Sequence, residues 1–253
     1  MKKLKDKVAI ITGGAQGIGL ATAKLFLQEG ACVMLVDIVE PELIKAVKEL
    51  NSGNVSYCIA DVSQANEVRE YVNKTLETYG KVDIFFNNAG IEGKVKPIID
   101  YPEETFDRII GVNLKGVWLG CQYGIPNMNN GGSVIITSSV AGLKGFKGLG
   151  AYVASKHACV GIMRTAALEC AERKIRVNSV HPGPVNNRMM RSIEKEMSVN
   201  NPEEVQKGFE ATIPFGRYAE SEEVAQLVLF LAGDDSSYLT GTIQIIDGGM
   251  HLS

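Results

Sequence analysis

The sequence predicts an α/β fold in which one doubly wound parallel sheet of about seven strands carries helices on both faces. Two observations support this prediction. Short β-branched runs alternate along the chain with longer stretches of helical periodicity, and the short runs are continuously apolar, as in parallel strands buried on both faces. At 253 residues and 45% hydrophobic content, the chain can bury a substantial core as a single domain over 1–253.

The predicted strands are the runs rich in valine and isoleucine. They lie at 8–12, 32–37, 56–60, 82–87, 133–138, 176–181 and 243–246. The predicted helices repeat apolar residues three or four positions apart, which places those residues on one face. They lie at 18–29, 42–50, 65–79, 104–123, 152–172 and 222–232. Because strands and helices alternate in this way, we expect parallel strands joined by right-handed crossovers.

The segment 184–215 breaks this alternation. It contains three methionines and mixed charges, and it has no strand of its own. One or two short helices are expected there. Long excursions from a compact domain are usually lids or binding loops, so the segment predicts a substrate lid, with a plain surface excursion as the alternative.

Charge and cysteine content argue against several functional classes. The net charge is −3 and no run of like charges occurs, so we expect neither a nucleic-acid nor a membrane partner. No stretch approaches the length of an apolar membrane span. The five cysteines are scattered without a Cys-x-x-Cys pair, which indicates buried thiols in a reducing compartment rather than disulfides or a metal site. We therefore expect a cytoplasmic protein.

A glycine-rich loop, Thr12-Gly-Gly-Ala-Gln-Gly-Ile-Gly19, joins the first predicted strand to the first helix. Its glycines permit a tight turn and close approach of a ligand to the backbone. The helix N-terminus then presents free N–H groups and a positive dipole end to a pyrophosphate. The candidate dinucleotide-binding residues of this loop are Gly13, Gln16, Gly17, Ile18 and Gly19.

An acidic residue, Asp37, ends the second predicted strand. Its carboxylate can accept both hydrogen bonds of an adenosine ribose and repels a 2′-phosphate. No arginine or lysine lies in the glycine loop or directly after Asp37. The predicted cofactor is therefore NAD rather than NADP. Asp61 and Val62, after the third strand, suit the edge and wall of the adenine site.

Tyr152 and Lys156 are the candidate catalytic pair. A spacing of four places a phenol and an ammonium on one face of a helix, one turn apart. A free phenol titrates near pH ~10, but a nearby cation favours the phenolate and brings proton exchange toward neutral pH. The same spacing occurs by chance on many amphipathic helices, so the surrounding motifs must decide.

Further motifs accompany this pair in a fixed order along nearly the whole chain. They are Asn87-Asn-Ala-Gly90, Asn113, Ser139 thirteen residues before Tyr152, Pro182-Gly183 and Asp247-Gly-Gly249. In this order and spacing, the chain resembles the short-chain dehydrogenase/reductase (SDR) family, whose members are oxidoreductases with a Rossmann-like fold.

The resemblance implies a role for each matching residue. Tyr152 exchanges a proton with the alcohol or carbonyl oxygen, and Lys156 assists it while binding the nicotinamide ribose. Ser139, rather than its neighbour Ser138, holds the substrate oxygen. Asn113 helps hold a water that links Lys156 to solvent. The remaining cofactor contacts implied by the family are Asn88, Ala89, Gly90, Pro182, Gly183, Val185 and Asn187. Many members carry threonine at the position of Asn187, so its contact with the nicotinamide carboxamide is open.

Together these inferences predict an NAD(H)-dependent oxidoreductase that interconverts a secondary alcohol and its ketone, with tyrosine as acid/base. The expected pocket is largely apolar, and its one carboxylate candidate, Glu92, is better explained as a solvated loop residue. Lysines near the mouth leave a 3-oxoacyl-acyl-carrier-protein reductase as the alternative, although Asp37 counts against it. A non-enzymatic dinucleotide-binding protein fits less well, because Tyr152 and Lys156 are both present.

The family resemblance also implies a homotetramer. In relatives, the helices that correspond to 104–123 and 152–172 form four-helix contacts between subunits. Here these helices carry apolar residues that we interpret as exposed, with core packing as the alternative. They are Trp118, Val160, Met163 and Leu168.

Overall fold

The computed structural model describes residues 2–252, so the first and last residues of the domain predicted over 1–253 lie outside it. This part of the chain holds one parallel sheet of seven strands in the order β3-β2-β1-β4-β5-β6-β7. The strands are β1 (Val8–Thr12), β2 (Cys32–Asp37), β3 (Val55–Ile59), β4 (Ile84–Asn87), β5 (Ser133–Thr137), β6 (Arg176–Pro182) and β7 (Ile243–Ile246). The strand order reverses between β1 and β4, which places a crevice at the carboxyl ends of those strands. The predicted fold class is confirmed.

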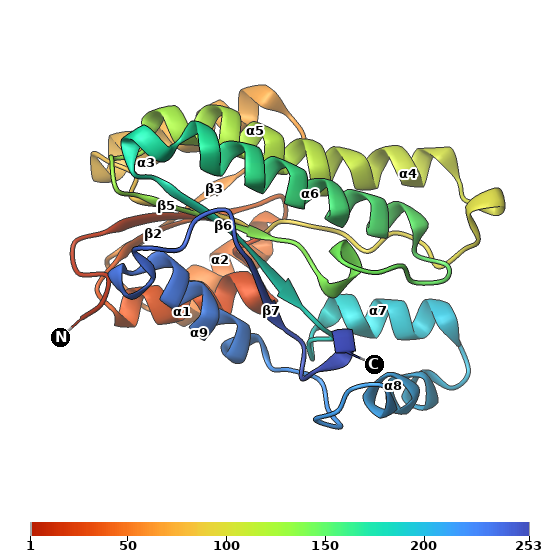
Figure 1. Cartoon of the computed structure of the whole chain (residues 1–253). Coiled ribbons are helices and arrows are strands. Elements are labelled where there is room, and N and C mark those ends of the chain that lie inside the picture. Colours follow the sequence, from red (N-terminus) through yellow and green to blue (C-terminus); the bar gives the residue numbers. More distant parts are fainter. Residues whose placement is uncertain (1, 253) are drawn as a thin grey trace.

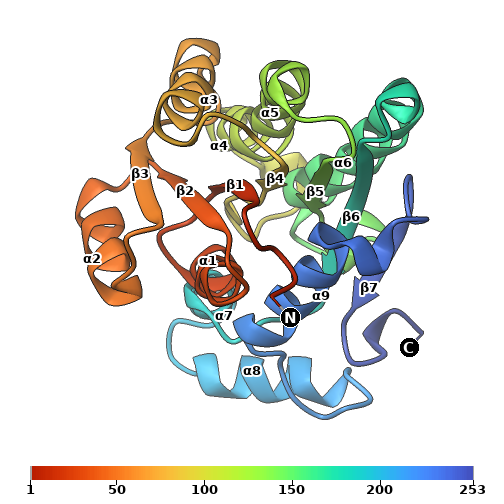
Figure 2. The same cartoon turned by 90° about the vertical axis from the view of Figure 1, so that its left-hand side faces the viewer.

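Helices cover both faces of the sheet (Figures 1 and 2). One face carries α1 (Gly17–Gln28), α2 (Glu40–Leu50) and α9 (Ser221–Ala232), and the other carries α3 (Ala65–Tyr79), α4 (Glu103–Ile109), α5 (Gly116–Gly124) and α6 (Gly150–Glu169). Ile10 belongs to the core cluster beneath α3, α5 and α6, whereas Ile11 belongs to the cluster beneath α1, α2 and α9. Successive strand residues point to opposite faces, so a strand covered on both sides must be apolar throughout.

The helix predicted over 104–123 is present as an unbroken helical run from Glu103 to Gly124, but its middle is not α-helical. A π-helical segment, Ile110–Lys115, separates α4 from α5. Apolar periodicity does not reveal such an insertion, because the pattern continues on both sides of it. Glycines let α5 approach the sheet closely: a Cβ on Gly120 would lie 2.2 Å from Asn87 Oδ1, and one on Gly124 would lie 2.6 Å from the Phe85 ring. The other predicted elements lie within three residues of the observed ones.

The segment 184–215 forms two short helices, as expected. They are α7 (Arg188–Met197) and α8 (Pro202–Ala211), which lie side by side near the carboxyl end of β6 (Figures 1 and 2). A single parallel bridge between Val185 and Ala219 joins the start of the segment to the chain before α9.

The apolar residues expected on the outside of the long helices divide into two pairs. Trp118 and Leu168 are 57% and 80% exposed, as interpreted. For Val160 and Met163 the interpretation is wrong, since both are buried in the core cluster with Cys159. Val160 lies four residues after Lys156, and Met163 lies three residues after Val160. These spacings place all three side chains on the face of α6 that packs on the sheet.

Several other features bear on the expected class of protein. Across residues 2–252, no helix is long and apolar enough to cross a membrane. All five cysteines are free thiols, and four of them are buried. The same residues contain no group of three or more histidine, cysteine, aspartate or glutamate side chains that could hold a metal ion.

Candidate active site

A cavity of about 840 Å³ opens at the carboxyl ends of the central strands. It brings together almost all of the predicted site residues. Those that line it are Gly13, Gln16, Gly17, Ile18, Asp37, Asp61, Val62, Asn88, Ala89, Gly90, Ser139, Tyr152, Lys156, Pro182, Gly183, Val185 and Asn187. Gly19 and Asn113 are buried and lie outside this lining.

The glycine loop has the geometry of a pyrophosphate cradle. Gly13 and Gly17 adopt φ values of 63° and 51°, in the left-handed region that favours glycine. A Cβ on Gly19 would lie 2.1 Å from the carbonyl oxygen of Gly13, so the loop can fold onto the helix start only with glycine there. No side chain caps the N-terminus of α1. The loop therefore fits a dinucleotide, because the unprotected helix start adjoins the cavity.

The carboxylate of Asp37 is held at the end of β2 by backbone donors. Its Oδ1 accepts the N–H groups of Ile38 at 2.8 Å and Val39 at 3.3 Å, and its Oδ2 accepts that of Ala15 at 3.3 Å. These contacts fix the carboxylate beside the glycine loop. Since a carboxylate has about four acceptor positions, one remains for a ligand hydroxyl.

Tyr152 and Lys156 lie in the first two turns of α6, with the ammonium nitrogen 5.6 Å from the centre of the phenol ring. Lys156 is 3% exposed, and its ammonium donates to the carbonyl oxygen of Thr137 at 2.8 Å. A buried ammonium needs further acceptors. Gly90 leaves room for one: a Cβ there would lie 3.4 Å from both Lys156 Nζ and Asn113 Oδ1. That space suits a ribose hydroxyl or a water.

Two adjacent serines differ in what their hydroxyls already bind. Ser138 is buried, and its hydroxyl donates to the carbonyl oxygen of Lys156 at 2.9 Å. The Ser139 oxygen accepts the N–H of Ala141 at 3.1 Å and has only a long 3.5 Å contact to the carbonyl oxygen of Pro182. The Ser139 hydroxyl hydrogen can therefore turn to a substrate oxygen, whereas that of Ser138 is committed to the protein.

Asn113 supports the site from behind. It lies in the π-helical segment, and its side-chain amide exchanges hydrogen bonds with the backbone of Ile91 at 2.8 and 2.9 Å. The amide also donates to Ser155 Oγ at 3.2 Å. Its backbone carbonyl accepts the thiol of Cys159 at 3.3 Å, which ties the segment to α6.

Asn187 stands where many SDR members carry threonine, and it caps α7. Its Oδ1 accepts the N–H of Met190 at 3.1 Å. A Cβ on Gly17 would lie 3.8 Å from Asn187 Cβ and 3.9 Å from its Nδ2, so the side chain lies beside the glycine loop. The Asn187 side chain thus lies between the start of α7 and the glycine loop.

The substrate end of the cavity is largely apolar, as predicted. Ile91, Val140, Phe146, Leu149, Met189 and Met190 line it. Sequence reasoning missed Ile193, Phe209 and Met250, which also line it. Helical spacing from Met189 and Met190 could have revealed Ile193, but the pattern carries no signal for the other two, which come from α8 and the C-terminal turn.

The interpretation of Glu92 as a solvated loop residue is wrong. Its side chain is 11% exposed and pairs with Arg188 across 3.7 Å. It lies outside the cavity lining, whereas Arg188 lines it. A second ion pair, Lys94 with Glu196 at 3.3 Å, also joins this loop to α7. Both pairs connect the segment 184–215 to the loop after β4.

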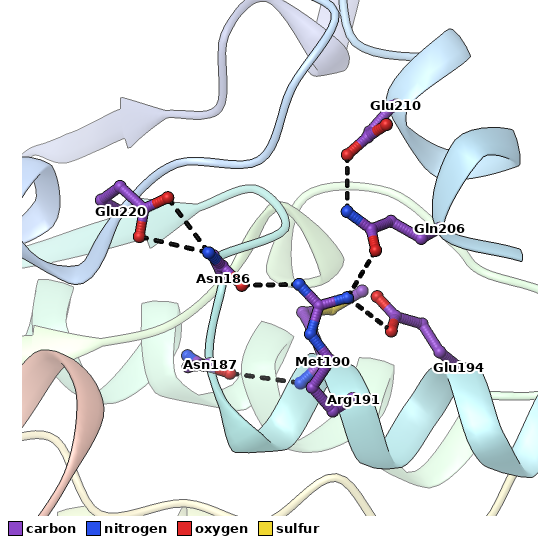
Figure 3. Close-up of polar contacts among 8 residues, drawn as sticks. All are labelled: Asn186, Asn187, Met190, Arg191, Glu194, Gln206, Glu210 and Glu220. Carbon is purple, nitrogen blue, oxygen red and sulfur yellow. Dashed lines mark hydrogen bonds and ion pairs between the residues drawn. The ribbon is translucent and has the colours of Figure 1, made fainter. Parts of the chain in front are cut away.

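A polar cluster holds α7 and α8 together, and we call it the Arg191 cluster (Figure 3). The Arg191 guanidinium donates to Glu194 at 2.8 Å, to Gln206 at 2.7 Å and to Asn186 at 2.5 Å. Asn186 in turn donates to Glu220, directly before α9, at 3.1 Å. The helices that bring Met190 and Phe209 to the cavity are thereby attached to the body of the domain.

Known proteins match this chain over nearly its whole length. A family model described as enoyl-(acyl carrier protein) reductase matches residues 13–251. Levodione reductase of Leifsonia aquatica is 38% identical over 253 residues, covering 98% of this chain and 95% of its own. A 3-oxoacyl-(acyl-carrier-protein) reductase of Thermotoga maritima is 42% identical, covering 98% and 99%. A cyclohexanol dehydrogenase of Acinetobacter sp. strain SE19 is 36% identical, covering 97% and 95%.

The structural comparison points the same way. The crystal structure of levodione reductase matches with a TM-score of 0.96 at 37% identity and covers 99% of both chains. The shared sheet, the matched family model and these full-length relatives agree on one assignment. The chain belongs to the short-chain dehydrogenase/reductase family of oxidoreductases.

Proposed function

We propose that this oxidoreductase interconverts a secondary alcohol and its ketone with NAD(H). One observation carries the proposal: a single cavity is lined by the glycine loop and Asp37 at one end and by Ser139, Tyr152 and Lys156 at the other. Such a cavity can hold an extended dinucleotide with its reactive end beside a proton-transfer group.

In this proposal the bound nicotinamide supplies hydride chemistry, and the chain's own residues orient the substrate and move the proton. The Ser139 hydroxyl donates to the substrate oxygen, and the Tyr152 hydroxyl exchanges the proton at the same oxygen. The Lys156 ammonium stabilises the phenolate electrostatically, in a site with little water to screen it. Asn113 helps hold the water that reconnects Lys156 to solvent.

The choice of NAD rests on Asp37. Two like charges about 4 Å apart near a protein surface repel by about 1–4 kcal/mol, which would disfavour a 2′-phosphate by about fivefold or more. The test is to compare kcat/KM with NAD and NADP for the wild type and for D37S. We expect the wild type to prefer NAD and D37S to lose most of that preference. A wild-type preference for NADPH would refute the assignment.

The substrate class follows from the apolar walls, which suit a small to medium cyclic or aliphatic alcohol. Two of the relatives are named for the reduction of levodione and the dehydrogenation of cyclohexanol, which supports a cyclic substrate. The alternative is a 3-oxoacyl-acyl-carrier-protein reductase, favoured by the relative at 42% identity. A panel of cyclic and linear alcohols and ketones, together with a 3-oxoacyl thioester, separates the two. Activity on the thioester alone would establish the alternative.

Three further features belong to the proposal. The exposed Trp118 and Leu168 support subunit contacts along the long helices, so we propose a homotetramer, to be checked by light scattering of wild type and W118K. The segment 184–215 acts as the substrate lid of a single domain. The five free thiols support a reducing, cytoplasmic location.

A further inference from the structure

His181 lies on β6 directly before Pro182 and is fully buried. Its Nδ1 is 2.9 Å from the backbone carbonyl oxygen of Ser139, and its Nε2 is 2.8 Å from Ser179 Oγ. Ser179 and His181 are two residues apart on one strand, so their side chains share a face of the sheet. The imidazole therefore bridges β6 and the turn that carries Ser139.

The partners of the ring determine its tautomer. A carbonyl oxygen only accepts hydrogen bonds, so Nδ1 must carry the proton, and Ser179 must donate its hydroxyl hydrogen to Nε2. Burial lowers the pKa of His181 to about 4, so the ring is neutral at physiological pH. Lys156 and His157 on α6 also disfavour the charged form, whereas the hydrogen bond to Ser139 acts in the opposite direction on the pKa.

The backbone carbonyl oxygen of Ser139 accepts two hydrogen bonds. Besides His181, it accepts the N–H of Gly142 at 2.8 Å, which fills both of its acceptor positions. Gly142 is pressed against α6, since a Cβ there would lie 2.8 Å from the carbonyl oxygen of Lys156. The turn 140–142 is thus fixed on one side by α6 and on the other by His181. Ser139 has little freedom to rotate about its backbone between these two supports.

We propose that His181 is a positioning residue that orients the Ser139 hydroxyl toward the substrate oxygen through the Ser139 carbonyl. The inference rests on the proposed role of Ser139. Without the imidazole, the carbonyl keeps only its bond to Gly142 and the turn gains freedom. A misplacement of about 1 Å in a catalytic group can lower the rate about 100-fold.

The experiment measures kcat, KM, NAD affinity by fluorescence titration, and melting temperature for H181F and H181N. Asparagine places an amide N–H₂ where Nδ1 lies, whereas phenylalanine removes the donor. We expect H181F to lower kcat about 10- to 100-fold with NAD affinity within about twofold of wild type, and H181N to recover most of kcat. V180A is the matched control, since it weakens the core on the opposite face of the same strand and should leave kcat unchanged.

A double-mutant cycle with S139A tests the route of the effect. If His181 acts through Ser139, H181F should cause no further loss of kcat in the S139A background. If the kcat losses of H181F and S139A multiply in the double variant, or if H181F keeps wild-type kcat, the inference is overturned. Should H181F fail to fold, H181Q substitutes for it, because its amide extends toward Ser179 rather than the carbonyl. If S139A itself retains wild-type turnover, the proposed function of Ser139 fails instead, which the cycle shows separately.

Discussion

Removal of Arg191 should open the segment 184–215 without unfolding the sheet. Arg191 joins α7 to α8 and to Asn186, and it pairs with Glu194, whose side chain is 2% exposed (Figure 3). R191M would leave that buried carboxylate without its cation. Within the described residues, Glu194 Oε1 has no hydrogen-bond partner.

The size of the effect follows from burial. Breaking a buried ion pair by removing one partner costs about 3–5 kcal/mol, but Arg191 is 38% exposed and solvent screens part of the interaction. We expect about 2 kcal/mol, which shifts the balance between the closed and open segment about 30-fold. That shift should raise KM for the substrate, because Met190 and Phe209 leave the cavity wall, while the melting temperature changes little.

Limited proteolysis within 188–211 and substrate KM are the two measurements. The control is R191M/E194Q, in which the stranded charge is also removed. The free-energy cost of R191M comes mainly from the uncompensated Glu194 carboxylate. The double variant should therefore reverse more than half of the increase in proteolysis and in KM. Unchanged proteolysis in R191M, or a double variant as open as R191M, would refute this reasoning.

Three further predictions follow from other parts of the molecule. Y152F should lower kcat about 10²- to 10⁴-fold and leave NAD binding intact, whereas Y57F, remote from the cavity, should behave as wild type in both assays. G120A should destabilise the fold by about 1–3 kcal/mol in denaturant titration, because its Cβ would lie 2.2 Å from Asn87 Oδ1; G161A, whose Cβ meets nothing within 4 Å, should be neutral or stabilising. The free energy of unfolding should fall by about 3 kcal/mol between pH 6.5 and pH 4, because unfolded His181 takes up a proton near 6.5 while the folded ring does so only near 4. This contribution levels off about one pH unit below the folded pKa, once both states are protonated. A comparison with H181N isolates it, and an identical loss of stability at acid pH in both proteins would contradict the assignment.

Sequence reasoning succeeded where the chemistry is local. The turn after β1 needs glycine at Gly13 and Gly17 because the backbone there is left-handed, and this requirement is visible in the residue types themselves. The spacing of Tyr152 and Lys156 sets their relation within one helix. Continuous apolar runs indicated a sheet covered on both faces, because every second side chain of a strand points to each side.

Relations between distant segments could not be obtained in this way. The π-helical segment that places Asn113, the burial of Val160 and Met163, and the ion pair of Glu92 depend on neighbours remote in the chain. The same holds for Phe209 and Met250, which reach the cavity from α8 and the C-terminal turn. A periodicity states which residues share a face, but not what packs against that face.

The amino-acid sequence alone thus defined a parallel α/β sheet, a glycine-rich turn before the first helix and a tyrosine–lysine pair, because each depends on short-range spacing. The thirteen-residue interval to Tyr152 and the family resemblance already favoured Ser139 over Ser138. The tertiary structure added the physical reason, since the Ser138 hydroxyl donates to the carbonyl oxygen of Lys156 whereas Ser139 has only a long contact to Pro182. It alone placed His181 behind the Ser139 carbonyl, across 42 residues of chain. Hydrogen bonds of that range form only when the sheet and its helices have assembled.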